Sequence, residues 1–511
     1  MPASPRPGGP PTRRRTPVAD SAPDLTSNLP LRPFIDGKPV DGTSGRTSPL
    51  VFPGNEQEIG RLSECSAADV DAAVRAARRE LEPGSAWSKM GPNDRQRILY
   101  RIAEALRSRA DEVARLETLN TGKPLAEAKF VDVGEAINVF EYFAGWATKV
   151  TGETLPDRPG AFLYTRREPV GVVGAITPWN FPLDLAVWKV APAIAAGCCI
   201  VLKPASLTPF SILKVAEIAL ECGLPPGVFS VVPGSGSVAG AALITHPGVD
   251  KVAFTGSTEI GKWVAKECAE HVKRCTLELG GKSPNVVLAD ADLDAAARGA
   301  TVGIFYNKGE VCAAGSRLLV EDSVHDAFME KLLARTAKMV PQDPFHPKSR
   351  LGPVVSKGQM ESVLGYVEKG KAEGAKLVAG GTRAKVREDG KGYYVNPTVF
   401  DEVDNDRHSI AREEIFGPVL SVIRVKDEAD AVAVGNRTMY GLAAAVWTRD
   451  IKKGLRVAHG LKGGTVWINS YNMYDPALPF GGYKASGWGR ELGSVAMDAY
   501  TEVKSVWVDL A

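Results

Sequence analysis

Short apolar runs alternate with helical segments over much of this chain, and this alternation restricts the fold more than any other feature. Apolar runs at residues 170–176, 199–202, 228–232 and 251–254 are separated by helical patterns at 209–222, 238–245 and 259–268. Crossover helices at this spacing connect parallel strands. The pattern therefore predicts an α/β fold with a Rossmann-like parallel sheet, whose ligands bind beyond the carboxyl ends of the strands.

The alternation extends beyond this first unit on both sides. Helical periodicity covers residues 67–114 and 125–147. A second α/β unit is expected from about residue 284, with a helix over 324–338 and strands near 394–400, 419–425 and 465–469. Two leftover segments, 152–169 and 501–508, read as strands outside both units.

Composition sets wide limits on function. A chain of 511 residues with 44% hydrophobic and 24% charged residues is expected to form a soluble protein of two or three domains. Its formal net charge of +2 gives no strong field for nucleic acid or an anionic membrane surface. No apolar run reaches the roughly 20 uncharged residues of a membrane helix, since the nearest, 187–202, contains Lys189.

Cysteine usage and the first residues complete this picture. The seven cysteines include no CxxC pair, so neither a zinc site nor a disulfide framework is indicated. Reduced thiols suit a cytoplasmic enzyme. Residues 1–30 are rich in Pro, Ser and Gly around an Arg13-Arg14-Arg15 run, and we expect a disordered tail there.

Three polar groups in unusual settings point to chemistry. Cys312 lies in a polar, glycine-rich run from Asn307 to Arg317, where we expect neighbours that stabilise a thiolate. Glu278 precedes a Gly-Gly turn, and Asn180 lies between two prolines. A nucleophile, a base and a fixed amide donor together suggest acyl chemistry at a carbonyl carbon.

These segments, together with four other motifs, resemble the aldehyde dehydrogenase superfamily. The other motifs are Lys203-Pro204-Ala205, Phe254-Thr255-Gly256-Ser257-Thr258-Glu259-Ile260-Gly261, Glu413-Glu414-Ile415-Phe416-Gly417-Pro418 and Pro479-Phe480-Gly481-Gly482-Tyr483-Lys484. They follow the order of the family from about Phe34 to the end of the chain. The resemblance implies an NAD(P)-dependent, non-acylating enzyme.

It also implies a division of the chain and a set of partners. Residues 31–150 and 170–282 would form the cofactor-binding domain, 283–493 the catalytic domain, and 151–169 with 494–511 an oligomerisation element. In the family such strands pair across subunits, and a free strand edge needs a partner. We therefore expect a homodimer or homotetramer that acts on a small-molecule aldehyde, with no nucleic-acid or membrane partner.

The resemblance assigns roles to the catalytic groups. Cys312 would attack the aldehyde carbon to form a thiohemiacetal, whose oxyanion is held by the Asn180 amide and the Cys312 N–H. Hydride transfer to nicotinamide would leave a thioester, which Glu278 hydrolyses as the general base of a water molecule. Lys189 and Glu491 resemble a family pair that relays protons.

A phosphate site is predicted at Gly256-Ser257, because a glycine, a hydroxyl and the start of a helix together favour an anion. The run from Gly234 to Gly240 has GxGxxxG spacing, which fits a dinucleotide turn and a plain strand-to-helix turn equally well. The resemblance places the adenosine ribose on Lys203 and the nicotinamide ribose on Glu414. The expected cofactor residues are Ile176, Thr177, Pro178, Trp179, Lys203, Ser206, Gly236, Gly240, Phe254, Gly256, Ser257, Leu279, Glu414 and Phe416.

The cofactor preference is predicted from Ser206. NAD-preferring members carry Glu at the matching position, where a carboxylate would repel a 2′-phosphate. Serine removes that repulsion. We therefore expect NADP to be accepted alongside NAD.

The substrate is the least constrained part of the prediction. Aromatic residues are expected to line the pocket: Phe181, Trp188, Tyr306, Tyr471 and Tyr474. Two acids, Glu135 and Asp184, are expected beside them. Acids with aromatics suit a cationic amino or betaine aldehyde. A broad aliphatic or aromatic aldehyde remains the rival. Two other classes are a nitrilase-like hydrolase using Cys312, Glu278 and Lys189, and a binding protein without activity. No metal site is expected.

Overall fold

The computed structural model describes residues 28–156 and 158–511, so the predicted tail lies almost entirely outside the described residues. Its first sheet has eight strands in the order β18-β10-β9-β6-β7-β8-β1-β2. The five central strands are parallel: β6 (Val172–Ile176), β7 (Cys199–Lys203), β8 (Phe229–Val231), β9 (Lys251–Thr255) and β10 (Arg274–Glu278). The predicted Rossmann-like sheet is thereby confirmed.

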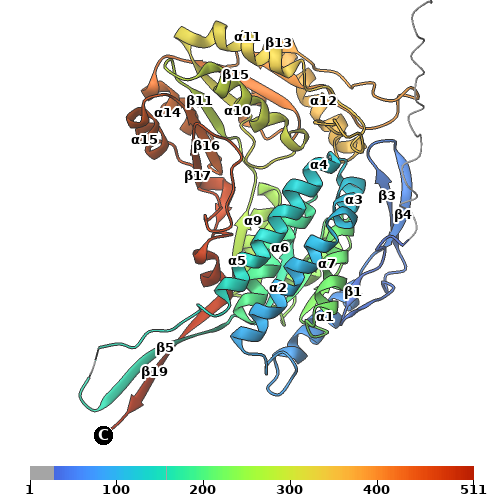
Figure 1. Cartoon of the computed structure of the whole chain (residues 1–511), viewed down its shortest axis with the longest axis vertical. Coiled ribbons are helices and arrows are strands. Elements are labelled where there is room, and N and C mark those ends of the chain that lie inside the picture. Colours follow the sequence, from blue (N-terminus) through green and yellow to red (C-terminus); the bar gives the residue numbers. More distant parts are fainter. Residues whose placement is uncertain (1–27, 157) are drawn as a thin grey trace, which may run out of the picture.

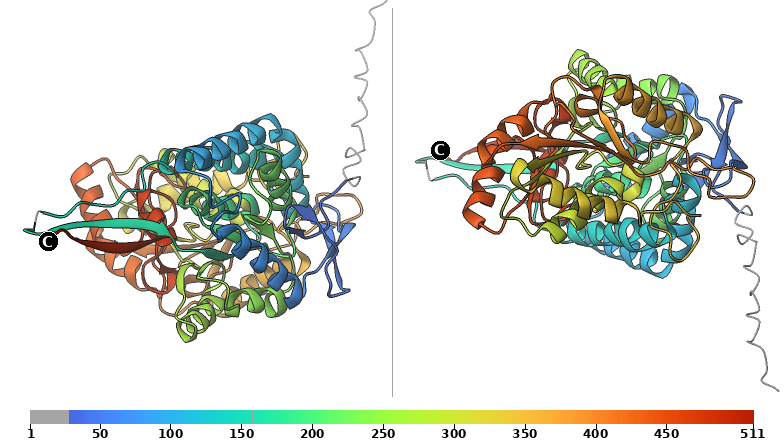
Figure 2. Two further views of the ribbon diagram at one scale, coloured as in Figure 1. Left: turned by 90° about the horizontal axis from the view of Figure 1, so that it is seen from below. Right: turned by 90° about the horizontal axis from the view of Figure 1, so that it is seen from above.

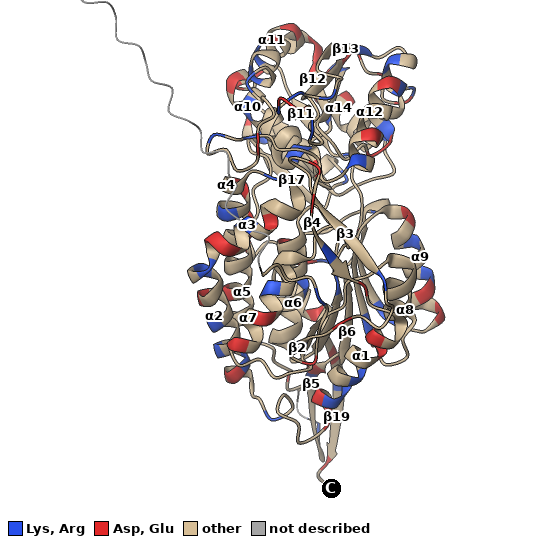
Figure 3. Cartoon of the chain, turned by 90° about the vertical axis from the view of Figure 1, so that its right-hand side faces the viewer, with Lys and Arg blue, Asp and Glu red and all other residues tan. Residues whose placement is uncertain are grey.

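Helices cover both faces of this sheet, which explains why its central strands are largely buried. Figure 3 shows one group of helices on each side of β6. One group is α2 (Pro92–Ser108), α5 (Gly134–Trp146), α6 (Pro182–Ala196) and α7 (Phe210–Glu221), and the other is α1 (Ala67–Leu81), α8 (Ala241–Thr245) and α9 (Thr258–Glu270). Both acidic and basic side chains lie on the outer surfaces of the helices (Figure 3). Every residue of α6 is buried, so this helix lies in the core of the unit.

The N-terminal part adds short edge elements. Strands β1 (Phe34–Ile35) and β2 (Lys38–Pro39) extend the first sheet antiparallel to β8, and β3 (Thr47–Phe52) pairs with β4 (Gln57–Ser63). The helical segment predicted over 125–147 follows α3 (Ala110–Thr121) and is divided. It contains a short α4 (Leu125–Glu127), a π-helical turn, η1 (Ala128–Val133), and α5.

The second unit has a seven-stranded sheet in the order β13-β14-β15-β12-β11-β16-β17. Its strands are β11 (Pro284–Val287), β12 (Arg317–Glu321), β13 (Lys376–Ala379), β14 (Thr398–Asp401), β15 (Val419–Val425), β16 (Ala443–Trp447) and β17 (Thr465–Ile468). Its helices are α10 (Leu293–Phe305), α11 (His325–Thr336), α12 (Lys357–Ala372), α13 (Ser409–Arg412), α14 (Glu428–Asn436) and α15 (Ile451–Gly460). Figure 1 shows this unit above the first one.

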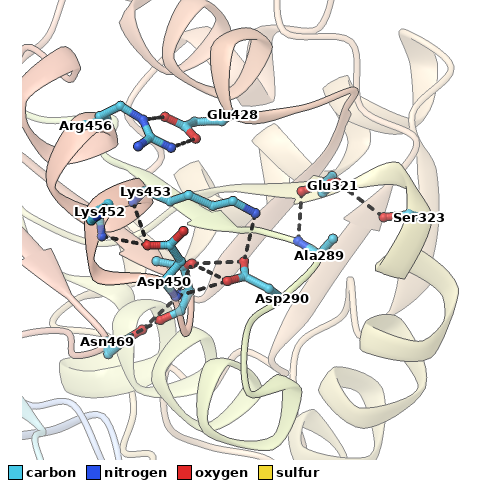
Figure 4. A network of polar contacts seen from close by, with 11 residues as sticks. Ala289, Asp290, Glu321, Ser323, Glu428, Asp450, Lys452, Lys453, Arg456 and Asn469 are labelled. Carbon is cyan, nitrogen blue, oxygen red and sulfur yellow. Dashed lines mark hydrogen bonds and ion pairs between the residues drawn. The ribbon is translucent and has the colours of Figure 1, made fainter.

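A polar network fixes the edge of the second sheet where β11 and β16 end (Figure 4). The Asp290 carboxylate accepts hydrogen bonds from the Thr448 hydroxyl at 2.8 Å and from the Asp450 N–H at 3.1 Å. Asp450 in turn caps α15 by accepting from the Lys452 N–H at 2.8 Å. This network serves the fold of the second unit.

The chain returns to the first sheet near its C-terminal end, where β18 (Gly487–Trp488) pairs antiparallel with β10. A two-residue strand has no periodicity from which its partner can be predicted. The division into a cofactor-binding domain, a catalytic domain over 283–493 and an oligomerisation element stays a prediction.

The two leftover segments pair with each other. β5 (Ala161–Pro169) and β19 (Thr501–Asp509) form an antiparallel ribbon that runs from Thr501 opposite Pro169 to Asp509 opposite Ala161. The ribbon projects away from both units in Figure 1, and Figure 2 shows it at the opposite end of the molecule from β3 and β4. Among the described helices, none is long and apolar enough to cross a membrane.

Candidate active site

Most of the predicted motifs meet in one cavity of about 230 Å³ between the two units. Its walls come from the ends of β6, β9 and β10, from the turn that carries Cys312, and from the segment after α13. The lining residues are Pro178, Trp179, Asn180, Leu185, Thr255, Gly256, Ser257, Leu279, Gly280, Cys312, Gln359, Glu414 and Phe416. The cavity therefore joins a candidate nucleophile to a candidate phosphate site.

Cys312 follows a turn with unusual backbone conformations. Asn307, Lys308 and Gly309 all have positive φ values, of 42°, 62° and 73°. Gly309 is required there, because a Cβ would lie 2.1 Å from the Gly417 carbonyl oxygen. Lys308 and Glu310 form a buried ion pair at 3.1 Å behind this turn, and Glu310 also accepts from the Val355 N–H at 2.9 Å. The turn is thus held from both sides.

The surroundings of Cys312 favour the thiol over the thiolate. Burial raises the pKa of the thiol to about 12, and the nearby Glu414 and Glu278 carboxylates add to the increase, while backbone N–H groups of Cys312 and Ala313 oppose it. The residues flanking Cys312 are polar in the sequence, but the charged groups that most affect its pKa are acids. Reaction of this thiol therefore calls for a base.

Asn180 is held in a fixed orientation beside this turn. Its side-chain amide donates to the Glu310 backbone carbonyl at 3.0 Å, and its backbone carbonyl accepts from the Asn307 side-chain amide at 2.9 Å. The side chain is almost fully buried. One N–H of the amide group remains for a ligand, which fits the predicted role of oxyanion donor.

Glu278 ends β10 and is 3% exposed. Neither of its carboxylate oxygens has a hydrogen-bond partner among the described residues. Burial raises its pKa well above the usual value, and the Glu491 carboxylate increases the pKa further. A Cβ on Gly481 would lie 2.7 Å from Glu278 Oε1, so glycine is needed at that position. A buried carboxyl with a raised pKa is suited to general-base chemistry near neutral pH.

The predicted relay pair is formed. Lys189 Nζ lies 2.5 Å from Glu491 Oε1 and donates to the Thr255 hydroxyl at 2.7 Å. Both side chains are buried. Glu491 raises the pKa of Glu278 and Lys189 lowers it, so the pair influences the candidate base through its charges.

On the cofactor side, Ser257 caps α9, and its hydroxyl accepts from the Ile260 N–H at 3.4 Å. Glu414 accepts from the Gly281 N–H at 2.9 Å, and a Cβ on Gly280 would lie 2.2 Å from Glu414 Oε2. Trp179 and Phe416 meet edge to face with ring centroids 5.1 Å apart. These groups fit a dinucleotide: a helix N-terminus for phosphate, a carboxylate for ribose hydroxyls and flat apolar walls.

Several predicted cofactor residues lie outside the lining of this cavity. They are Ile176, Thr177, Lys203, Ser206, Gly236, Gly240 and Phe254. Lys203 Nζ donates to the carbonyls of Pro204 and Gly234 at 2.8 and 3.1 Å, and Ser206 also donates to Gly234 at 3.0 Å. A Cβ on Gly236 would meet nothing within 4 Å, so that glycine is not needed for steric reasons in this structure.

The predicted substrate residues form two aromatic groups. The rings of Phe181 and Tyr306 stack with centroids 6.0 Å apart. Trp188 meets Phe480 at 5.3 Å and Tyr474 at 6.4 Å. Tyr471 donates its hydroxyl to the Ala313 carbonyl at 2.8 Å, so it supports the Cys312 turn.

The two predicted acids differ in their surroundings. Asp184 is 6% exposed, and burial raises its pKa well above the usual value, with further contributions from Asp132 and Glu117. Lys123, which pairs with Asp132, partly offsets the increase and lies 4.3 Å from the Phe181 ring centroid. Glu135 is half-buried, and burial together with Asp475 raises its pKa. Asp184 is therefore a buried acid that favours its neutral form.

Several residues of the site were not predicted, among them Leu185, Thr255 and Gly280 of the cavity lining. Gln359 of α12 lines the cavity and donates to the Phe416 carbonyl at 2.7 Å. Phe480 packs against Trp188 in the second aromatic group. It belongs to one of the motifs quoted above, but no substrate role was predicted for it. Gln359 lies on a helix surface with no local signal in the sequence. In the described part of the chain, no group of His, Cys, Asp and Glu could hold a metal ion.

Comparisons with known proteins agree with this geometry. Residues 40–506 match the sequence profile of the Aldehyde dehydrogenase family. The mitochondrial aldehyde dehydrogenase of Rattus norvegicus is 46% identical over 476 residues, which cover 93% of this chain and 91% of that protein.

Solved structures show the same likeness. The NAD⁺ complex of aldehyde dehydrogenase from Bacillus cereus has 47% identity and a TM-score of 0.91, covering 94% of this chain and 97% of that one. The indole-3-acetaldehyde dehydrogenase AldA of P. syringae, solved with NAD⁺ and IAA, has 42% identity and a TM-score of 0.92, covering 95% and 98%.

The fold and the site define a nicotinamide-dependent oxidoreductase. The chain belongs to the aldehyde dehydrogenase family. The predicted enzyme class, an NAD(P)-dependent aldehyde dehydrogenase, is thereby confirmed.

Proposed function

We propose that this enzyme oxidises an aldehyde to the carboxylic acid through a thioester on Cys312. The observation that carries the proposal is the single cavity that Cys312 and Asn180 line together with Gly256, Ser257 and Glu414. Ser257, Glu414 and the Trp179–Phe416 wall would hold the cofactor. When bound, the cofactor supplies the hydride acceptor.

The remaining steps are assigned to side chains and backbone groups of the protein. The Cys312 sulfur bonds to the aldehyde carbon, and its proton passes to a base. The second N–H of the Asn180 amide and the Cys312 N–H stabilise the oxyanion; one such donor contributes about 3–4 kcal/mol to lowering the barrier. After oxidation, Glu278 takes a proton from water as the oxygen adds to the thioester carbon. The C–S bond then breaks and the sulfur leaves.

The experiment is an assay of reduced-cofactor absorbance with purified enzyme, an aldehyde and NAD or NADP. Aldehyde-dependent reduction supports the proposal. A nitrilase-like hydrolase would instead release ammonia from a nitrile or amide without any nicotinamide. Activity of that kind, with no cofactor reduction for any aldehyde, would refute the dehydrogenase mechanism.

For the cofactor, we propose that NADP is accepted alongside NAD because Ser206 places no negative charge near the ribose. Ser206→Glu is expected to lower kcat/KM for NADP relative to NAD by about tenfold or more, since like charges placed together are costly. The ratio of kcat/KM for the two cofactors measures this effect. Ser206→Gln is the neutral control. A wild-type preference for NAD above about a hundredfold contradicts the proposal.

For the substrate, the geometry favours an uncharged aldehyde with an apolar or aromatic body. The walls around Phe181, Tyr306, Trp188 and Tyr474 are aromatic. Asp184, the acid expected to attract a cation, is buried and favours its neutral form. The AldA relative, named for an aromatic aldehyde, has this same fold at 42% identity.

An amino or betaine aldehyde is the second candidate, favoured by Glu135 together with Asp475. Glu135→Gln separates the two readings. If the enzyme prefers an uncharged aldehyde, this variant should change kcat/KM by less than about twofold, the usual size of a surface effect. The change should be equally small for an amino aldehyde and for an uncharged aldehyde of the same length. A selective loss of about tenfold for the amino aldehyde would favour the cationic substrate instead.

We also propose that the β5–β19 ribbon forms a contact between subunits. It exposes apolar side chains, with Val503 and Trp507 58% exposed and Leu510 65% exposed. A two-stranded ribbon has a free edge on each strand, and such edges pair readily with another chain. A homodimer or homotetramer built on the ribbon would cover these side chains.

A further inference from the structure

The ion pair behind the Cys312 turn is completely enclosed by the protein. Lys308 and Glu310 are 1% and 0% exposed, and Lys308 Nζ lies 3.1 Å from Glu310 Oε2. Removing two charges from water is costly, and their mutual attraction often does no more than offset that cost. Stability alone therefore does not explain a buried pair of this kind, and its contacts indicate what else it does.

The backbone of Lys308 is strained as well. Its φ of 62° lies in the left-handed region, where residues other than glycine are uncommon. Strained residues persist only where the surrounding structure fixes them, and they cluster at functional sites. Glycine would adopt this conformation at lower cost. The amine is the group that a lysine offers at this position and a glycine does not.

The two side chains of the pair reach different neighbours. Lys308 Nζ donates to the carbonyl of Thr121, the last residue of α3, at 3.1 Å. Glu310 Oε1 accepts from the N–H of Val355, two residues before α12 begins, at 2.9 Å. The other oxygen, Oε2, has no hydrogen-bond partner among the described residues besides its ion pair with Lys308. The pair thus links the turn to the end of α3 and to the start of α12.

Glu310 also orients the predicted oxyanion donor through its backbone. Its carbonyl accepts from the Asn180 side-chain amide at 3.0 Å and from the Asn307 side-chain amide at 3.2 Å. Asn307 in turn donates to the Asn180 backbone carbonyl at 2.9 Å. The direction of the second N–H of the Asn180 amide therefore depends on where the Glu310 carbonyl lies. The Glu310 carboxylate, held from two sides, limits the movement of that carbonyl.

We propose that Lys308 and Glu310 are positioning residues that aim the Asn180 amide at the oxyanion. Neither side chain lines the cavity, so both act through the Glu310 carbonyl and not by contact with substrate or cofactor. A displacement of about 1 Å in a catalytic group can lower the rate about 100-fold, so anchors outside the cavity can have a large effect. This inference rests on the proposed function of Cys312 and Asn180.

The test is a single-turnover experiment with enzyme in excess over aldehyde and with saturating cofactor, in which reduced cofactor is followed by absorbance. The methionine variant, Lys308→Met with Glu310→Met, removes both anchors and leaves no unpaired charge buried. It should form reduced cofactor at least about tenfold more slowly than the wild type, whereas its Kd for cofactor should change by less than about twofold. Glu368→Gln, which removes an exposed ion pair with Lys371 on α12, is the matched control and should match the wild type.

Two further enzymes distinguish positioning from a structural role. The glutamine variant, Lys308→Gln with Glu310→Gln, removes both charges, but its amides can still bond to Thr121, to Val355 and to each other. Its rate should therefore lie within about threefold of the wild type. In an Asn180→Ala enzyme, adding the two methionine substitutions should change the rate by less than about twofold, because the group that the pair positions is already gone.

A wild-type rate in the folded methionine variant would overturn the inference and leave the proposed function intact. Losses that multiply with the loss in Asn180→Ala would also overturn it, because the pair would then act independently of that amide. A glutamine variant as slow as the methionine variant would assign the effect to charge and contradict positioning by these contacts.

Folding of each variant is checked by circular dichroism. If the methionine variant does not fold, Lys308→Met alone replaces it in the same comparisons, because it removes the contact to Thr121 and keeps the Val355 bond. An unchanged rate in Lys308→Met would contradict the inference. Absence of reduced cofactor in the wild type, for every aldehyde, would instead refute the proposed function.

Discussion

Replacement of Cys312 by serine is expected to lower kcat/KM for every aldehyde by at least about 10⁴-fold, because the sulfur is the only group assigned to bond carbon. A hydroxyl has a much higher pKa than a thiol, and Glu278 would have to remove a less acidic proton in the same buried site. Cofactor binding should be unaffected, since Cys312 only borders that part of the cavity.

The measurement is steady-state reduction of cofactor, with binding followed separately by cofactor fluorescence or calorimetry. Cys222→Ser is the matched control, because Cys222 is a half-buried thiol at the end of α7, away from the cavity. Retention of more than a few per cent of activity in Cys312→Ser would contradict the assignment. Equal losses in both cysteine variants would do so as well.

Glu278→Gln is expected to separate oxidation from hydrolysis. Glutamine has the shape of glutamate but cannot take a proton from water, so steady-state turnover should fall by about 10³-fold, within the usual range for a general base. The first turnover should still produce reduced cofactor. A stopped-flow trace should therefore show a burst followed by a nearly flat phase.

The pH dependence follows from the direction of the pKa shift. Burial and Glu491 raise the pKa of Glu278, and the deprotonated carboxylate is the active form. Wild-type turnover should therefore fall as the pH is lowered through this raised pKa, and the dependence should disappear in Glu278→Gln. Glu270→Gln, at an exposed position on α9, serves as the control. An unchanged steady-state rate in Glu278→Gln would exclude Glu278 as the base.

The sequence was most informative where a motif and a strand end coincide. Asn180 and Ser257 each follow a predicted parallel strand, and the carboxyl ends of such strands meet at one edge of a sheet. Their convergence could therefore be predicted without coordinates, whereas Glu278 ends β10, a strand that was not predicted. The two strands outside both units were also predicted, but their pairing with each other was not.

Other features depend on contacts between distant segments. The polar neighbours of Cys312 in the chain suggested a stabilised thiolate, but its neighbours in space are Glu278 and Glu414. Asp184 was expected to attract a cationic substrate, whereas it is buried, and Asp132 raises its pKa further. Gln359 reaches the cavity only because α12 packs next to Phe416.

The most direct test is the intact mass of Glu278→Gln, quenched in acid after one turnover with cofactor and an aldehyde. An acyl group should be found on the peptide that contains residue 312, in an amount equal to the reduced cofactor formed. Stoichiometric cofactor reduction with no adduct, or an adduct on another side chain, would contradict covalent capture by this sulfur.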